Sequence, residues 1–139
     1  MKIRSGFVSN SSSSSFVVLK DILSNKQKDM ILYYQDWVKF FIDLDKKKGG
    51  PENLENEFSH CDSDPWRIVE EKDYIFGETS MDNFSMYDFF NYIEVDHDFV
   101  NWDDGYNSEP YNSQLEFIKK MKKKYRKEKI KKIERNNDL

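Results

Sequence analysis

The sequence of 139 residues has little of several residue types that restrict a fold or supply chemistry. Its single cysteine, Cys61, excludes an intramolecular disulfide and any zinc site built on several cysteines. With five glycines and two histidines, it has no glycine-rich phosphate loop, no nucleophile elbow and no paired-histidine metal motif. No apolar run approaches the roughly 18–20 residues of a membrane span, and no secretory signal opens the chain. These absences predict a soluble cytoplasmic protein without membrane attachment, metal or cofactor.

Aromatic and charged residues are abundant instead. Eleven Phe, eight Tyr and three Trp offset an apolar content of only 37%. Because each ring buries roughly 150–250 Å² when packed, these residues make a folded core feasible. The segment 52–110 carries 17 acids against two bases, whereas 111–139 carries 11 bases against four acids. This asymmetry fits either two polar surfaces that face different partners or an acidic body complemented by a basic terminal helix.

Hydrophobic periodicity predicts a long helix over residues 25–48. Ser24 and Gln27 have the spacing of a capping box, and Gly49 with the residues around it is typical of a helix end. Apolar side chains between these limits recur at intervals of four and three, and we assign this stripe to the core. The stripe consists of Met30, Tyr34, Trp37, Phe41 and Leu44.

Two further helices are predicted nearer the C-terminus. Residues 82–94 carry aromatic side chains at helical spacing and form a shorter amphipathic helix. Ser113 and Glu116 have a second capping-box spacing, which opens a long basic helix at about 114–135. This basic helix is the only part of the net-acidic chain suited to nucleic acid, although a charge run is more often a solvated helix face.

Strands are predicted where β-branched and aromatic residues cluster. Residues 1–8 and 16–20 each fit a short strand, and residues 66–70 and 74–79 fit a hairpin. A serine-rich loop at 9–15 joins the first two, since serine competes for backbone hydrogen bonds and buries little surface.

The remaining segments are rich in acids and turn-forming residues. We predict a surface loop at 51–65, with a helical turn near 53–58, and an irregular turn region at 96–112. The fold class is therefore α+β: a single domain, 1–139, with a small mixed sheet packed by two long helices and one short helix. Three apolar residues of the last segment are expected to dock on the core: Phe99, Val100 and Trp102.

Candidate catalytic residues are few. Cys61 follows His60, and His97 lies between Asp96 and Asp98. Imidazole, thiolate and carboxylate groups can ligate zinc or manganese, and a histidine can activate a thiol. Adjacent residues rarely converge on one ion or form a catalytic pair, however, so we assign no catalytic and no metal site. A small enzyme that depends on a metal or on these His and Cys residues stays an alternative.

Two stretches carry a resemblance. GFVSNSSSSSFVV, residues 6–18, resembles an N-terminal signature of many uncharacterised proteins from tailed bacteriophages and the bacteria they infect. ETSMDNFSM, residues 78–86, resembles a second recurring stretch of that group, in which a strand leads into a short helix. The resemblance implies origin rather than activity, and no functional residue is carried over. A framed serine tract of this kind could be a processing or recognition site, or an anion-binding loop.

These observations predict a small acidic accessory protein of phage type, which binds and modulates a host protein in the host cytoplasm. The acidic 52–110 segment is the expected contact, because its carboxylates and aromatic rings can engage a basic surface. A virion or assembly component is the other alternative, and a homodimer stays open. The expected partner-binding residues are Asp96, Asp98, Phe99, Trp102, Asp103, Asp104, Tyr106 and Glu109.

Overall fold

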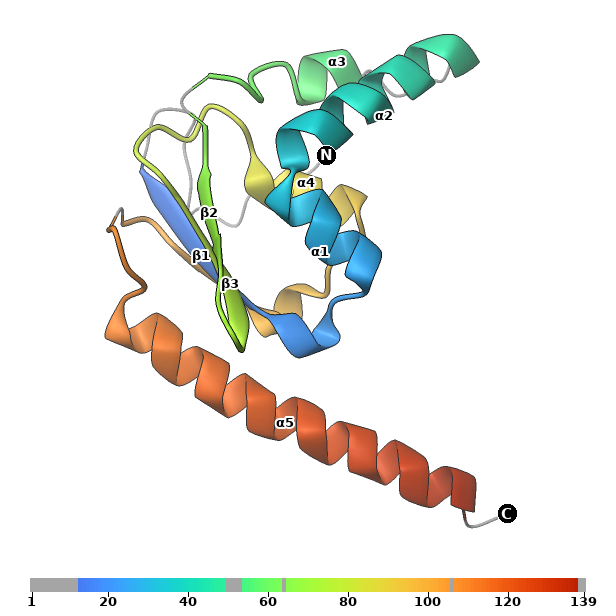
Figure 1. The fold of residues 1–139 in the computed structure, drawn as a ribbon, viewed down its shortest axis with the longest axis vertical. Coiled ribbons are helices and arrows are strands. Elements are labelled where there is room, and N and C mark those ends of the chain that lie inside the picture. Colours follow the sequence, from blue (N-terminus) through green and yellow to red (C-terminus); the bar gives the residue numbers. More distant parts are fainter. Residues whose placement is uncertain (1–12, 50–53, 64, 106, 138–139) are drawn as a thin grey trace.

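The computed structural model describes residues 13–49, 54–63, 65–105 and 107–137. It confirms the α+β class: a four-stranded sheet carries helices on both of its faces (Figure 1). Every pairing between described strands is antiparallel, and the strand order is β2-β3-β1-β4. The sequence had indicated only a small mixed sheet. The strands are β1 (Ser14–Leu19), β2 (Arg67–Glu70), β3 (Tyr74–Thr79) and β4 (Val100–Asp103).

Strand β1 lies in the middle of the sheet, and all six of its residues are buried. Two of these residues, Ser14 and Ser15, were predicted to belong to the serine loop and are instead 0% and 1% exposed. The pairing partners explain the correction, because the backbone of these serines continues the ladder opposite Thr79 and Glu78 of β3. Residues 1–12, which include the other predicted N-terminal strand, lie outside the described part.

The predicted helix at 25–48 is two helices. The capping box of Ser24 and Gln27 opens α1 (Asn25–Leu32), and Gly49 ends α2 (Tyr34–Lys48) in the left-handed conformation, both as predicted. Between them the backbone of Tyr33 leaves helical geometry, with φ −120° and ψ 42°. After the break, Tyr34 and Val38 are buried in the core, whereas Leu44 near the end of α2 is 37% exposed.

One face of the sheet is covered by α1 and α2 together with two short helices, α3 (Leu54–Glu57) and α4 (Met86–Tyr92). The hairpin and the helical turn at α3 were predicted, but segment 54–61 is not the surface loop that was expected. Leu54, Phe58 and Cys61 are at most 6% exposed and join this core. Helix α4 is shorter than the predicted 82–94, because Ser85 caps it by accepting a hydrogen bond from the Asp88 amide.

The turn region at 96–112 contains a strand that the sequence did not predict. A 3₁₀ helix, η2 (His97–Phe99), leads into β4, which forms one edge of the sheet by pairing with β1. Phe99, Val100 and Trp102 pack against the core as expected, but on different faces: Phe99 faces α5, whereas Val100 and Trp102 face α1 and α4.

The opposite face of the sheet is covered by α5 (Asn112–Asn137), the longest described helix (Figure 1). It begins two residues before the predicted start, and Gln114 rather than Glu116 closes its first turn, since the Gln114 Oε1 accepts from the Tyr111 amide at 3.0 Å. Ile118 and Met121 are buried, but Ile130 and Ile133 are about half exposed because the helix runs past the sheet. In the described part of the chain, no helix is both long and apolar enough to cross a lipid bilayer.

Candidate binding site

The structure disperses the partner-binding residues expected from the sequence. Asp96 caps η2 by accepting a hydrogen bond from the Asp98 amide at 3.0 Å, and both residues are exposed. Phe99 is 5% exposed and packs edge to face against Tyr125, so its ring serves the core rather than a contact surface. Trp102 is half-buried on the other side of the sheet.

Three of the other expected residues, Asp103, Asp104 and Glu109, precede α5 in the chain. The Asp103 carboxylate accepts from the Gly105 amide at 2.7 Å, and the exposed Asp104 offers its carbonyl to the Ser13 hydroxyl. Tyr106 lies outside the described residues. Glu109 lines a cavity beside the sheet.

The histidine and cysteine residues do not gather into a reactive centre. Cys61 is buried, and this burial raises the pKa of its thiol, which is the opposite of what a nucleophile needs. His97 stacks on Tyr87 with ring centroids 4.4 Å apart, and burial lowers its pKa and so favours the neutral ring. Among the described residues there is no group of three or more His, Cys, Asp or Glu placed to hold a metal ion.

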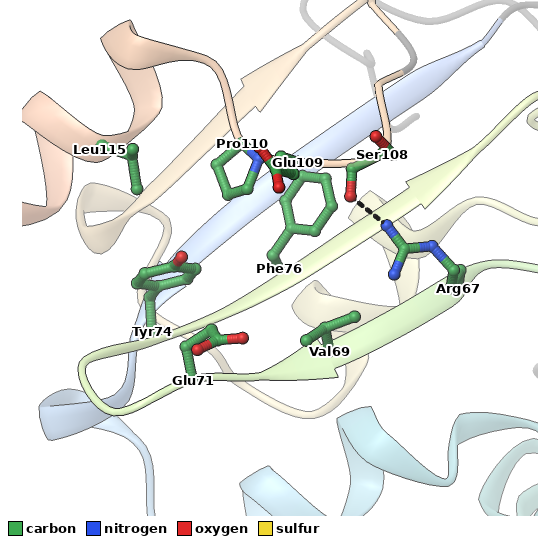
Figure 2. Close-up of a pocket in the computed structure, with 9 residues that line it drawn as sticks. All are labelled: Arg67, Val69, Glu71, Tyr74, Phe76, Ser108, Glu109, Pro110 and Leu115. Atoms are coloured by element: carbon green, nitrogen blue, oxygen red, sulfur yellow. Dashed lines mark hydrogen bonds between the residues drawn. The ribbon is translucent and has the colours of Figure 1, made fainter.

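A cavity of about 390 Å³ lies on the α5 side of the sheet, where β2 and β3 meet the segment that leads into α5 (Figure 2). Alternation along the two strands places Val69, Phe76 and Tyr74 on this face, since Val69 and Phe76 are direct cross-strand partners. Pro110 and Leu115 cover the cavity from the chain above. The floor and part of the roof are therefore apolar, and charged side chains stand at the rim.

An ion pair holds one wall of the cavity. Arg67 donates from Nε to Glu78 Oε1 at 2.8 Å and from a terminal nitrogen to the carbonyl of Ser108 at 2.5 Å. It thereby ties the 108–110 segment to the sheet, as the dashed line in Figure 2 shows. Glu78 is 3% exposed, and its Oε2 has no hydrogen-bond partner among the described residues, so Arg67 is the group that offsets its buried charge.

Two other carboxylates at the cavity have no such partner. Within the described part of the chain, Glu71 and Glu109 form no ion pair, and the nearby Lys20 is already paired with Glu70 at 2.8 Å. The pKa of Tyr74 is raised, first by burial and then by the charges of Glu71 and Glu109. Arg67 is paired with Glu78, and Lys20 is paired with Glu70 and also donates to the Glu71 carbonyl at 3.0 Å. Glu71 and Glu109 are therefore the carboxylates at the cavity that no ion pair of the described residues offsets.

The sequence could not reveal this arrangement. Arg67 and Ser108 are 41 positions apart, and Gln114, which hydrogen-bonds the Ser15 hydroxyl at 3.2 Å, is 99 positions from it. The one available signal was that Arg67 is one of only two bases in the acidic 52–110 segment.

The cavity combines an apolar, aromatic floor with two carboxylates at its rim, Glu71 beside Tyr74 and Glu109 beside Pro110 (Figure 2). Such a site suits a group with an apolar stem and a cationic head. No family model matches the chain, and no significant match is found among curated protein sequences or solved structures.

Proposed function

We propose that this chain is a binding protein that covers a basic surface of another protein, and that the cavity on the α5 side receives a lysine or arginine side chain of that partner. The observation that carries the proposal is the pair of carboxylates, Glu71 and Glu109, unpaired among the described residues, beside the apolar floor of a 390 Å³ cavity. The acidic 52–110 segment supplies both carboxylates and most of the floor.

The chemistry of the cavity favours lysine or arginine over an acidic or neutral side chain. Their methylene stems pack on apolar surface while their heads stay near charge and water. Val69, Phe76 and Leu115 offer that apolar surface, and the Tyr74 ring beside Glu71 offers an aromatic face to a cation. An acidic side chain would meet like charge at the same position.

The partner we propose is a host protein with a basic functional surface, in keeping with the resemblance of residues 6–18 to proteins of tailed bacteriophages. Complementary charge steers such a pair together and raises the association rate. The chain would modulate its partner by occupying that surface, which requires no catalytic group of its own.

Titration with short peptides tests the cavity directly. We expect a peptide with one central arginine or lysine to shift the amide signals of Tyr74, Phe76 and Leu115 in a ¹⁵N spectrum. The affinity should be millimolar, because one side chain buries little area. The double variant Glu71→Gln, Glu109→Gln should weaken binding at least about fivefold, as two charge-assisted contacts are lost.

A matched control changes the net charge equally at a distance: Glu128→Gln with Glu134→Gln, both exposed on α5. It should bind like the parent protein. Equal binding of a peptide with glutamine at its centre, or an unchanged affinity in the cavity variant, would rule out the cavity as a cation site. A complex with a host protein should likewise dissociate near 0.5 M salt, where screening acts within a few ångströms, and a complex that survives would contradict the electrostatic contact.

A further inference from the structure

A strip of apolar side chains is left exposed along the outer side of α2 and is not used by the cavity. Tyr33 is 59% exposed, Phe40 54%, and Leu44 and Tyr92 are 37% exposed. Trp37 and Phe41 join them, since the rings of Trp37 and Phe40 lie 5.8 Å apart and those of Phe41 and Tyr92 lie 5.1 Å apart. We call these six residues the α2 strip.

The α2 strip is contiguous, unlike the isolated exposed apolar residues that every protein surface carries. Contiguous apolar patches of this kind mark interaction surfaces, and aromatic residues are enriched at the centres of such surfaces. A shallow, open hollow of about 250 Å³ lies on this surface beside Asp36, Trp37 and Phe40. The α2 strip therefore has the features of a protein interaction surface.

Charges beside the strip indicate what covers it. Asp36 lies in the first turn of α2 and Lys47 in the last. Because they are 11 residues apart, which is close to three helical turns, both lie on the same flank of the strip. Neither forms an ion pair among the described residues, whereas Lys39 and Lys46 pair with Asp62 and Glu55.

We propose that a second copy of this chain covers the α2 strip, with α2 packed antiparallel against α2 of the other copy about a two-fold axis. In this arrangement Asp36 of each copy faces Lys47 of the other, so the charge pair forms twice, and the two helix dipoles run in opposite directions. Phe40 lies near the axis, where its ring packs against Phe40 and Leu44 of the other copy.

The dimer leaves the cation-binding cavity open. Helix α2 and helix α5 cover opposite faces of the sheet, so the dimer presents two cavities directed away from the interface (Figure 1). Two linked cavities would bind a partner with repeated basic side chains more tightly than one. The dimer does not depend on that function, however, and its test uses only the protein itself.

Sedimentation velocity over a concentration series tests the dimer. A contact made by one helix pair and its flanks is small, so we expect a weak dimer that is populated only at about 10–500 μM. Phe40→Glu should raise the dissociation constant at least about tenfold, since it places two carboxylates in an apolar contact. Ile130→Glu, at an equally exposed position on α5, is the matched control and should leave dimerisation unchanged.

Charge exchange tests the antiparallel arrangement. Asp36→Lys and Lys47→Asp should each weaken the dimer about threefold to tenfold, because each places like charges face to face twice. The double variant should restore the parent dissociation constant to within about twofold. A protein that stays monomeric at about 1 mM, a dimer indifferent to Phe40→Glu, or a double variant as weak as the single ones would each overturn the proposal.

Discussion

The two faces of the sheet differ in how they are covered. The face under α1, α2 and α4 carries a large cluster of buried apolar residues, in which Phe16 contacts Trp66, Phe90 and Trp102 at centroid distances of 5.7, 4.9 and 5.3 Å. The face under α5 has a much smaller buried cluster, which gives way to the Arg67–Glu78 pair and the cavity.

This difference separates stability from recognition. In a dense aromatic core each ring contact stabilises the folded state, and voids are costly, so this core stabilises the fold. The α5 face buries less apolar surface and keeps charged groups near solvent, which makes it the better place for a contact that must form and dissociate. The variants below test that division, beginning with the largest expected effect.

Removing an aromatic ring from each face gives the strongest contrast. Phe16→Ala should lower the free energy of unfolding by about 3–5 kcal/mol, because the 0% exposed ring leaves a cavity among other rings. Phe117→Ala, at a half-buried position on α5, should lower the free energy of unfolding by clearly less. Urea unfolding measures both, and Phe16→Leu serves if the alanine variant does not fold. Similar losses for the two variants would contradict the proposed division.

A finer comparison uses neighbouring residues of one strand. Val18 and Val17 are both 0% exposed in β1 and face the large and the small cluster respectively. Each valine-to-alanine change should lower the free energy of unfolding by about 1–3 kcal/mol, and Val18→Ala should lower it more. The single helix α5 can move to fill a small void more readily than a core enclosed by four helices can. The same urea series measures the difference, and a larger loss for Val17→Ala would reverse the comparison.

The helices α1, α2 and α4 of the large cluster were predictable from sequence, whereas its members Leu54, Phe58 and Cys61 were expected in a surface loop. These helices are indicated by the spacing of apolar residues and by caps such as Ser24 and Gly49, and both are local signals in the sequence. The break at Tyr33 was missed because the apolar period continues across it. Gly77 shows a further limit: a Cβ there would lie 2.2 Å from the Phe16 ring, a constraint visible only after the two strands pair.

The α5 side was predicted less well, because its features depend on contacts between distant residues. Strand β4 is short and lies among Asp and Asn residues, so its composition indicates turns, and only pairing with β1 makes it a strand. Ser15 is a strand residue for the same reason. Of the candidate site, the sequence predicted its acidic segment and Glu109, whereas the cavity itself depends on Arg67 holding the 108–110 segment over β3.

The smallest expected effect concerns the basic helix and the acidic body. Lys122 pairs with Asp73, and the hydrogen bond from Lys122 is the largest cause that holds the pKa of Asp73 below its ordinary value of 3.8. Lys122→Ala should therefore lower the melting temperature slightly at low salt and not at high salt, whereas Lys123→Ala, at an exposed neighbouring position, should leave it unchanged.

The pH dependence of that small effect has a definite sign. A carboxyl group whose pKa is lower in the folded state contributes stability above its unfolded pKa, and this stability is lost as the pH falls through the folded pKa. The difference between the parent protein and Lys122→Ala should therefore be present at pH 7 and vanish as the pH falls below 3.8. Thermal melts from pH 7 to pH 3 measure it. A difference that persists in acid would mean that the Lys122 stem, rather than its charge, holds α5 against the β2–β3 turn.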